Sequence, residues 1–250
     1  MKRALAISGF DPTGGAGILL DIKVFSRFEV YGYGVITAYT VQTPRDVLEI
    51  KPQDASTFRK ALQTLLYHLS PNAVKIGMLA SSELVNETAM LIKRFSLKNI
   101  VLDPILKSKN GYPLITDEGI KEMIYRLFPL VALVMPNADE ISTFTGMEVK
   151  NIENARIAVR EFYKSFKVPV LLKGGHLDGE PVDIFYDGNN LLEFGGKRKR
   201  NSPHGTGCLL SAACTAILAK GTKLDDAIAG AKKFTAMIIK SAGNEPLLPL

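Results

Sequence analysis

The sequence lacks the features of a membrane protein and of a disulfide-rich secreted protein. No apolar run approaches the roughly 20 residues that are needed to cross a bilayer. The N-terminal segment MKRALAISGF reaches polar residues too soon for a secretory signal, so we expect a cytoplasmic protein without a membrane partner. Only two cysteines occur, Cys208 and Cys214, and their spacing places them on different faces of one predicted helix. This spacing is unsuited to a disulfide or a zinc clamp and agrees with a reducing compartment.

The charge balance is basic, with 31 Lys and Arg against 25 Asp and Glu. A nucleic-acid-binding protein clusters its basic residues on one face, whereas these are mostly scattered along the chain. The one dense run, Lys197 to Arg200, is typical of a solvated edge strand, where positive charge deters pairing between sheet edges. We therefore expect a small-molecule partner and no nucleic acid.

The chain has 250 residues, of which 46% are hydrophobic, and we expect one α/β domain over 1–250. Short β-branched apolar runs alternate with longer amphipathic stretches, which predicts a mostly parallel sheet with helices on both faces. The expected buried strands are Ala4–Ser8, Ala73–Ile76, Asn99–Leu102, Leu130–Val134 and Val168–Leu172. The expected helices are Ala16–Phe28, Ala55–Leu69, Glu83–Phe95, Asp117–Leu127 and Ala155–Phe166. Two further runs, Tyr33–Tyr39 and Val47–Ile50, read as exposed or antiparallel strands of a small sheet.

Polar residues follow each of the predicted buried strands. Ligands of an open parallel sheet bind outside the carboxyl ends of its strands, so these segments are candidates for a site. The same residues are also ordinary in turns, and position alone leaves both interpretations open. The segments are Ser8–Asp11, Gly77–Met78, Asp103–Pro104, Pro136–Asn137 and Lys173–His176.

The segment His204-Gly205-Thr206-Gly207-Cys208 precedes LLSAACTAILA, which predicts a buried helix. Glycines let backbone amides converge, and a helix N-terminus adds positive potential, so the segment predicts an anion hole for a transferring phosphoryl group. A plain helix start with Thr206 as N-cap is the structural alternative. The segment is not a Walker loop, because no Lys and Ser or Thr follow its last glycine.

Cys208 falls in the first turn of that helix, where the dipole can lower the pKa of a thiol below its free value of about 8.5. A partly ionised thiol there could accept the proton of a substrate hydroxyl. Phosphoryl transfer has a loose transition state, so a modest base suffices and positioning dominates. The alternative is a small buried thiol that packs at a helix start.

A glycine-rich turn, Gly9 to Gly17, follows the first strand. Its spacing differs from the dinucleotide fingerprint, and no acidic residue ends the next strand. The turn allows close backbone approach of a flat ligand, whose polar edge Asp21 could bind from the following helix. The alternative for Asp21 is a solvated acid near the helix start.

Acidic and amide side chains follow two later strands. Asn137 and Glu140 suit water-mediated binding of Mg²⁺, although the same pair also forms a plain capping box. Asp103, fixed by Pro104, is the second acidic candidate. Lys173 can reach nucleotide phosphates as a point charge.

Taken together, these segments resemble the hydroxymethylpyrimidine and phosphomethylpyrimidine kinases of thiamin biosynthesis, a branch of the ribokinase superfamily. The resemblance covers nearly the whole chain. The segments that carry it are GFDPTGGAGILLDIKVF, VKIGML, VLDPIL, MPNADE, LLKGGH and HGTGCLLSAA. It implies a ribokinase-like three-layer αβα sandwich, ATP and Mg²⁺ as cofactors, and a homodimer through the region Tyr31 to Tyr39.

By matching position, the resemblance assigns roles to individual residues. Gly205, Thr206 and Gly207 form the anion hole, with Cys208 as the base and Lys173 beside it. The residues placed around the pyrimidine are Gly9, Asp21, Gln42, Met78 and Ile105. Asp103 and Glu140 lie near Mg²⁺, and Asn137, Lys173 and Thr206 lie near the nucleotide. Gln42 fits this role physically, because its amide can face a ring nitrogen and the adjacent amino group.

We therefore expect transfer of the γ-phosphoryl group of ATP to 4-amino-5-hydroxymethyl-2-methylpyrimidine and then to its monophosphate. The nearest alternative is a pyridoxal or pyridoxine kinase, which catalytic efficiency on the two acceptors would separate. A nucleotide-binding regulator without catalysis is disfavoured by the presence of Cys208, Asp103, Glu140 and Lys173. A nucleic-acid-binding protein would show steep salt dependence and a mobility shift.

Overall fold

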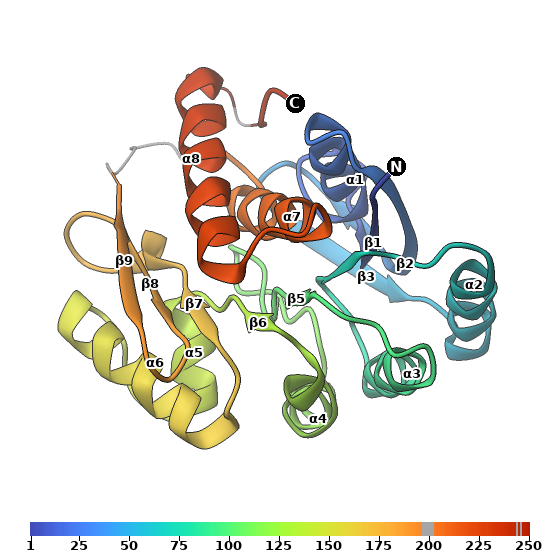
Figure 1. The fold of residues 1–250 in the computed structure, drawn as a ribbon, viewed down its shortest axis with the longest axis horizontal. Coiled ribbons are helices and arrows are strands. Elements are labelled where there is room, and N and C mark those ends of the chain that lie inside the picture. Colours follow the sequence, from blue (N-terminus) through green and yellow to red (C-terminus); the bar gives the residue numbers. More distant parts are fainter. Residues whose placement is uncertain (197–202, 244, 246) are drawn as a thin grey trace.

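One mixed sheet runs across the computed structural model, which describes residues 1–196, 203–243, 245 and 247–250 (Figure 1). Within these residues the strands lie in the order β3-β2-β1-β4-β5-β6-β7-β8-β9. Their bounds are β1 (Arg3–Phe10), β2 (Tyr31–Gln42), β3 (Val47–Pro52), β4 (Ala73–Ile76), β5 (Ile100–Leu102), β6 (Leu133–Val134), β7 (Val170–Leu172), β8 (Val182–Tyr186) and β9 (Leu191–Gly195). Six neighbouring strands, β2, β1, β4, β5, β6 and β7, pair in parallel. The strands at the two edges, β3 on one side and β8 and β9 on the other, are antiparallel to their neighbours. The basic run at 197–200 lies outside the described residues.

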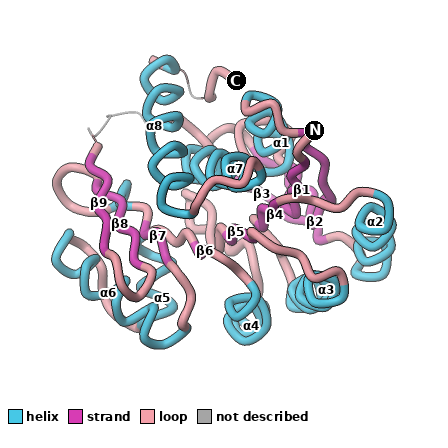
Figure 2. Tube along the Cα trace, viewed as in Figure 1, coloured by secondary structure: helices cyan, strands magenta, loops and turns pink. Residues whose placement is uncertain are grey.

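Helices cover both faces of the sheet, which confirms the expected three-layer sandwich (Figures 1 and 2). Their bounds are α1 (Gly17–Arg27), α2 (Ala55–His68), α3 (Ser82–Arg94), α4 (Asp117–Glu122), α5 (Ala138–Thr145), α6 (Ile152–Phe166), α7 (Thr206–Ala219) and α8 (Leu224–Ala242). Helices α1, α7 and α8 form the upper layer, and α2 to α6 form the lower layer. Among the described helices, none is long and apolar enough to cross a bilayer.

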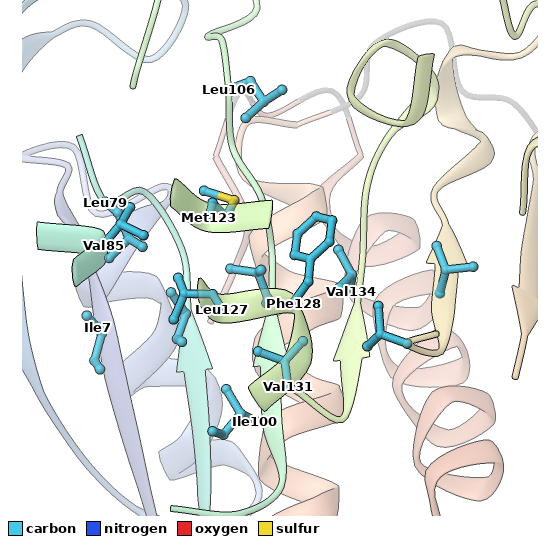
Figure 3. Packing of buried hydrophobic residues seen from close by; sticks show 14 of the residues in the cluster. Ile7, Leu79, Val85, Ile100, Leu106, Met123, Leu127, Phe128, Val131 and Val134 are labelled. Atoms are coloured by element: carbon cyan, nitrogen blue, oxygen red, sulfur yellow. The ribbon is translucent and has the colours of Figure 1, made fainter. Parts of the chain in front are cut away.

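The lower layer differs from the sequence prediction at one point, the helix expected over Asp117–Leu127. The α-helix ends at Glu122, and a π-helical turn over Met123–Leu127 and a 3-10 turn over Phe128–Leu130 follow it. The expected strand Leu130–Val134 therefore begins only at Leu133. Figure 3 shows Met123, Leu127 and Phe128 pointing into the buried cluster beside the strands. The π-helical turn thus carries Met123 and Leu127 into the core.

Aromatic and aliphatic side chains fill the lower layer. The Phe128 ring lies 5.2 Å from Phe144 and 5.5 Å from Phe162, measured between ring centroids. Phe128 is 1% exposed and Phe162 is fully buried. Full burial of such a side chain stabilises the fold by about 1.5–3 kcal/mol.

Helix α7 is buried on nearly every side, as its apolar sequence predicts. It packs against α1 and α8 within its own layer and against β1, β4 and β5 of the sheet. Such a central helix holds its N-terminus in a fixed place relative to the strand ends.

Strand β2 corrects the prediction of a separate small sheet. It pairs in parallel with β1 along its first part and in antiparallel with β3 at its end, so both strands extend the main sheet. Tyr33 is buried, and its hydroxyl donates to the Leu69 carbonyl at 2.6 Å. Tyr31 and Tyr39 are about half exposed on this edge. A homodimer contact through Tyr31 to Tyr39 stays a prediction.

Candidate active site

A cavity of about 1770 Å³ opens at the carboxyl ends of the parallel strands, where the sequence predicts a site. Segments that follow β1, β2, β4, β5, β6 and β7 contribute to its wall. It brings together all but one of the predicted site residues: Gly9, Gln42, Met78, Asp103, Ile105, Asn137, Glu140, Lys173, Gly205, Thr206, Gly207 and Cys208. The exception is Asp21.

The first turn of α7 forms one wall of the cavity. The N-cap is Gly205, with φ at +83° and no capping side chain, so Thr206 is the first helical residue and the alternative of a Thr206 cap is wrong. The amides of Thr206, Gly207 and Cys208 precede the first intrahelical bond, which Leu209 donates to the Gly205 carbonyl at 2.8 Å. Three backbone donors and the helix dipole therefore favour an anion here.

Glycine is required at the helix start for a steric reason as well. A Cβ atom on Gly205 would overlap the carbonyl oxygen of Gly15, which belongs to the glycine-rich turn after β1. The positive φ of Gly205 is also strained for any other residue. The two glycine-rich segments are thus in backbone contact.

Lys173 lies beside the anion hole. Its Nζ is 2.5 Å from Asp103 Oδ1, 3.8 Å from Glu140 Oε2 and about 3.5 Å from the place where a Cβ on Gly207 would be. The Lys173 side chain is 14% exposed, and the charge of Asp103 raises its pKa although burial lowers it. The lysine is therefore a permanent positive charge next to the start of α7.

Asp103 is held on both sides. Its Oδ1 pairs with Lys173, and its Oδ2 accepts a hydrogen bond from Ser211 Oγ at 3.0 Å. Burial raises the pKa of Asp103, but Lys173 and Lys75 outweigh it, so the pKa lies below its usual value. Asp103 is thus ionised and orients Lys173.

Glu140 forms the capping box that its sequence allows, and it also lines the cavity. Its Oε2 accepts the Asn137 backbone N–H at 2.7 Å, while Asn137 Oδ1 accepts the Glu140 N–H at 2.8 Å, which completes a capping box at the start of α5. Burial raises the pKa of Glu140 to about 7, and Lys173 only partly offsets this. The carboxylate nevertheless lines the cavity and keeps Oε1 outside the capping box.

The expected magnesium ligands fit the ion only in part. Both oxygens of Asp103 are engaged, so Asp103 is poorly placed as a direct ligand. No group of three metal-ligating side chains occurs in the described part of the chain. Mg²⁺ needs only one or two carboxylates when substrate phosphates and waters supply the other ligands. Glu140 fits that smaller demand.

The pKa of Cys208 differs from the sequence expectation. Burial raises it to about 11, although the nearby Lys75 ammonium and the Gly17 backbone N–H lower it. Burial therefore outweighs the groups that favour the thiolate. Cys208 is therefore a neutral thiol near pH 7, and the prediction of a partly ionised thiol is wrong.

Asp21 lies behind the cavity wall and does not line the cavity. It is fully buried on α1, and its Oδ1 accepts from Lys75 Nζ at 2.5 Å. Neither of its predicted roles, direct contact with the substrate or a solvated first-turn acid, agrees with this placement. Sequence reasoning missed Lys75, although a lysine within the apolar strand AVKI was a usable signal.

The end of β2 carries an amide that lines the cavity, that of Gln42. Gln42 Oε1 accepts from Thr40 Oγ1 at 2.9 Å, which orients the amide. Its Nε2 lies 3.5 Å from His204 Nε2, and the same ring nitrogen lies 2.9 Å from Asp11 Oδ2. His204 thus connects the glycine-rich turn, Gln42 and the start of α7, a role that the sequence did not reveal.

An apolar wall adjoins Gln42. Met78 belongs to a small cluster with Ala38, Ala80 and Leu114, and Ile105 packs against it. A Cβ atom on Gly9 would overlap the Met78 methyl group, so glycine keeps this side of the cavity open. The wall suits a flat ring.

The far end of the cavity is built by α8 and β9, which sequence reasoning did not assign. Lys232 Nζ pairs with Asp183 Oδ2 at 2.6 Å, and Asp183 Oδ1 accepts the Gly174 N–H at 2.9 Å. This network fixes α8 against the turn that follows Lys173. No local motif marks it, because its members come from three distant segments.

The family described as phosphomethylpyrimidine kinase matches residues 11–246. The chain belongs to that family. The hydroxymethylpyrimidine/phosphomethylpyrimidine kinase of Aquifex aeolicus is 37% identical over 241 residues, which cover 96% of this chain and 94% of that protein. The pyridoxine kinase of Bacillus subtilis is 34% identical over 251 residues, which cover 97% of this chain and 92% of that protein.

Solved structures give the same result. The phosphomethylpyrimidine kinase of Clostridium difficile 630 superposes with a TM-score of 0.83 at 33% identity, covering 97% of this chain and 99% of that one. The pyridoxal kinase of Staphylococcus aureus in complex with AMP-PCP and pyridoxal gives a TM-score of 0.89 at 28% identity, covering 100% and 93%. The chain is thus a ribokinase-like kinase of the family that holds both kinds of vitamin kinase.

Proposed function

We propose that this kinase transfers the γ-phosphoryl group of ATP to 4-amino-5-hydroxymethyl-2-methylpyrimidine and then to its monophosphate. The observation that carries the proposal is the meeting of the α7 amides, the Lys173 ammonium and the Cys208 thiol at one place in the cavity. Phosphoryl transfer depends mainly on positioning and on stabilising charge, and these groups supply both.

The nucleotide lies, in this proposal, between the α7 start and the α8 end of the cavity. The amides of Thr206 to Cys208 receive the γ-phosphoryl oxygens, and Lys173 neutralises charge that develops on them. Glu140 would hold a phosphate-bound Mg²⁺, which supplies further charge stabilisation. Relatives support this use of nucleotide, since the Staphylococcus aureus kinase was solved with AMP-PCP.

The acceptor ring lies against Met78 and Ile105, with its polar edge toward Gln42. The Gln42 amide offers an acceptor and a donor side by side, which matches an amino group next to a ring nitrogen. The hydroxymethyl oxygen then points toward the start of α7. Its attack forms the new P–O bond, the bond to ADP breaks, and the hydroxyl proton passes to the Cys208 thiolate.

The thiolate is a minor species near neutral pH, because burial raises the pKa of Cys208 to about 11. Such a thiolate is a strong base once it is formed. The chemical step should therefore quicken as pH rises toward the thiol pKa.

Pyridoxal kinase activity is the second candidate, and the 34% identity to the Bacillus subtilis pyridoxine kinase favours it. Pyridoxal also presents a flat ring with a hydroxymethyl group. It lacks the adjacent amino group that Gln42 would recognise, so we expect it to be the weaker acceptor.

A coupled assay of ADP release decides between the candidates. Purified protein with ATP and Mg²⁺ receives the pyrimidine alcohol, its monophosphate or pyridoxal, and kcat/KM is compared. We expect the highest value for a pyrimidine acceptor. Higher efficiency on pyridoxal would replace the proposed substrate, and no turnover on any of the three would reject the proposal.

A further inference from the structure

A buried ion pair under the anion hole is not used by the chemistry described so far. Lys75 Nζ and Asp21 Oδ1 are 2.5 Å apart, and neither side chain has any exposed surface. Removing two charges from water is costly, and well-packed apolar residues in their place are often equally stable. The pair therefore calls for a functional explanation.

The pleat of β4 places Lys75 directly beneath the upper helices. Val74 and Ile76 belong to the lower core cluster, whereas Ala73 belongs to the upper one. Because side chains alternate along a strand, Lys75 points to the same side as Ala73. There α1 supplies Asp21, and α7, which packs on β4, supplies Cys208 in its first turn.

Four charged groups act on Cys208 from the elements around it. The Lys75 ammonium is the strongest of the nearby charges that favour the thiolate, and Lys173 also favours it from beside the α7 start. Asp103 and Asp21 disfavour the thiolate. The Gly17 backbone N–H, at the start of α1, favours it as a hydrogen-bond donor.

The pair is also incompletely satisfied. Asp21 Oδ2 is buried and has no hydrogen-bond partner within the described part of the chain. A buried carboxylate with an unused acceptor is destabilising, so the arrangement is poorly explained by fold stability alone. If Asp21 serves to anchor Lys75, only Oδ1 is required, and the unpaired Oδ2 is accounted for.

We propose that Lys75, held in place by Asp21, is a positioning residue for Cys208. Its ammonium stabilises the Cys208 thiolate, and this thiolate then takes the proton of the acceptor hydroxyl. This inference rests on the proposed function of Cys208 as proton acceptor. The Lys75 ammonium keeps its own proton throughout the step. Asp21 prevents the ammonium from moving away from the sheet, and it touches no substrate.

The thiolate can be measured without turnover. The rate of alkylation of Cys208 by iodoacetamide, followed by mass spectrometry between pH 7 and 9.5, reports the thiolate fraction. We expect Lys75→Met to slow alkylation about tenfold at each pH, which corresponds to a rise of one pKa unit. Asp21→Asn should slow alkylation by a smaller factor, because the Lys75 ammonium loses its anchor while a repelling negative charge is removed as well.

A double variant guards against loss of folding in the single ones. Lys75→Met with Asp21→Leu replaces the pair by apolar side chains, so we expect a melting temperature near that of the wild type. Its alkylation should still be slower than in the wild type, although less so than in Lys75→Met, since the attraction of Lys75 exceeds the repulsion of Asp21. Alkylation at the wild-type rate in this folded variant would overturn the inference.

Two controls separate a positioning role from a structural one. Phe162→Leu in the lower layer should lower the melting temperature without changing the alkylation rate. Cys208→Ala shows any signal that comes from Cys214, the second buried thiol. An equal slowing in Phe162→Leu would mean that loss of stability alone explains the effect, and the inference would fall.

Activity adds a second readout. Lys75→Met should lower kcat at least tenfold with little change in KM for either substrate, and Lys75→Arg should recover part of it. If the protein phosphorylates neither acceptor, the proposed function fails, while the alkylation results still test the interaction of Lys75 with Cys208. If turnover is normal and Lys75→Met leaves kcat unchanged, only the present inference fails.

Discussion

The two layers of helices cover the same sheet, yet they differ in what they bury. The lower layer, formed by α2 to α6, packs aliphatic and aromatic side chains around Phe128 and Phe162. The upper layer, formed by α1, α7 and α8, also packs apolar residues against the sheet, but it encloses the charged Lys75 and Asp21. Buried charges cost stability, so the placement of this pair on the side that carries the start of α7 indicates a division between support and chemistry.

The contrast can be tested by substitution in each layer. A change in the lower layer should affect the free energy of unfolding and leave the rate per folded molecule intact. A change at the cavity end of the upper layer should lower the rate per folded molecule more than it lowers the free energy of unfolding.

Cys208→Ala gives the largest expected difference: kcat should fall about 100- to 10,000-fold, the range for loss of a general base. Nucleotide binding, measured by calorimetry, should remain within a factor of about two to three, and turnover like that of the wild type would remove Cys208 from the mechanism.

Lys173→Met should have the next largest effect. Loss of the charge beside the start of α7 should lower kcat about 100- to 1,000-fold, as expected for a group that stabilises transition-state charge. It also leaves the buried Asp103 with Ser211 as its partner, so the melting temperature should fall. Lys173→Arg serves as the matched control that keeps the charge. Equal kcat values for the Met and Arg variants would contradict the electrostatic role.

Phe162→Ala tests the lower layer. Removing this fully buried ring should destabilise the protein by about 3–5 kcal/mol, measured by urea unfolding. At a temperature where the variant is folded, kcat and KM should match the wild type. A marked loss of kcat in the folded variant would show that the layers are not separate in function.

The pH dependence of Glu140 gives a smaller effect with a defined sign. Its folded pKa of about 7 lies above its usual 4.5, so the folded protein holds this proton more tightly than the unfolded chain. The stability contributed by Glu140 is therefore full below about 4.5 and is lost as pH rises through 7. Cation binding needs the ionised form, so the affinity for ATP in the presence of Mg²⁺, measured by calorimetry, should rise severalfold from pH 6 to 8. In Glu140→Gln, both trends should be flattened.

Gln42→Leu should affect binding of the acceptor alone. It keeps the side-chain size but removes the amide that we propose binds the acceptor, so KM for the pyrimidine should rise about tenfold, the equivalent of 1.4 kcal/mol. KM for ATP and the melting temperature should not change. An unchanged acceptor KM would place the ring elsewhere in the cavity.

The sequence predicted the sheet, most of its helices and the place of the cavity because these depend on local periodicity and on a general rule of parallel sheets. The sequence also predicted that Lys173, Glu140 and Cys208 lie close together, because two of them follow strand ends and the third lies at the start of α7. These signals are local. They survive in the structure because the topology forces strand ends together.

The sequence failed where a property depends on what covers a residue. Asp21 reads as accessible on α1, but α7, from the other end of the chain, buries it. The same desolvation reverses the expected shift in the pKa of Cys208. The pair of Lys232 and Asp183 had no signal at all, since each residue alone is an ordinary surface type.

The contact between Gly205 and the Gly15 carbonyl has a consequence for engineering new acceptor specificity. A loop transplanted from another kinase into the turn after β1 must reproduce the backbone path at Gly15, or it will displace the backbone amides at the start of α7. Libraries that vary this turn should therefore keep its backbone length and randomise only side chains that face the ring. Chimeras that exchange both glycine segments together should keep catalysis more often than chimeras that exchange one.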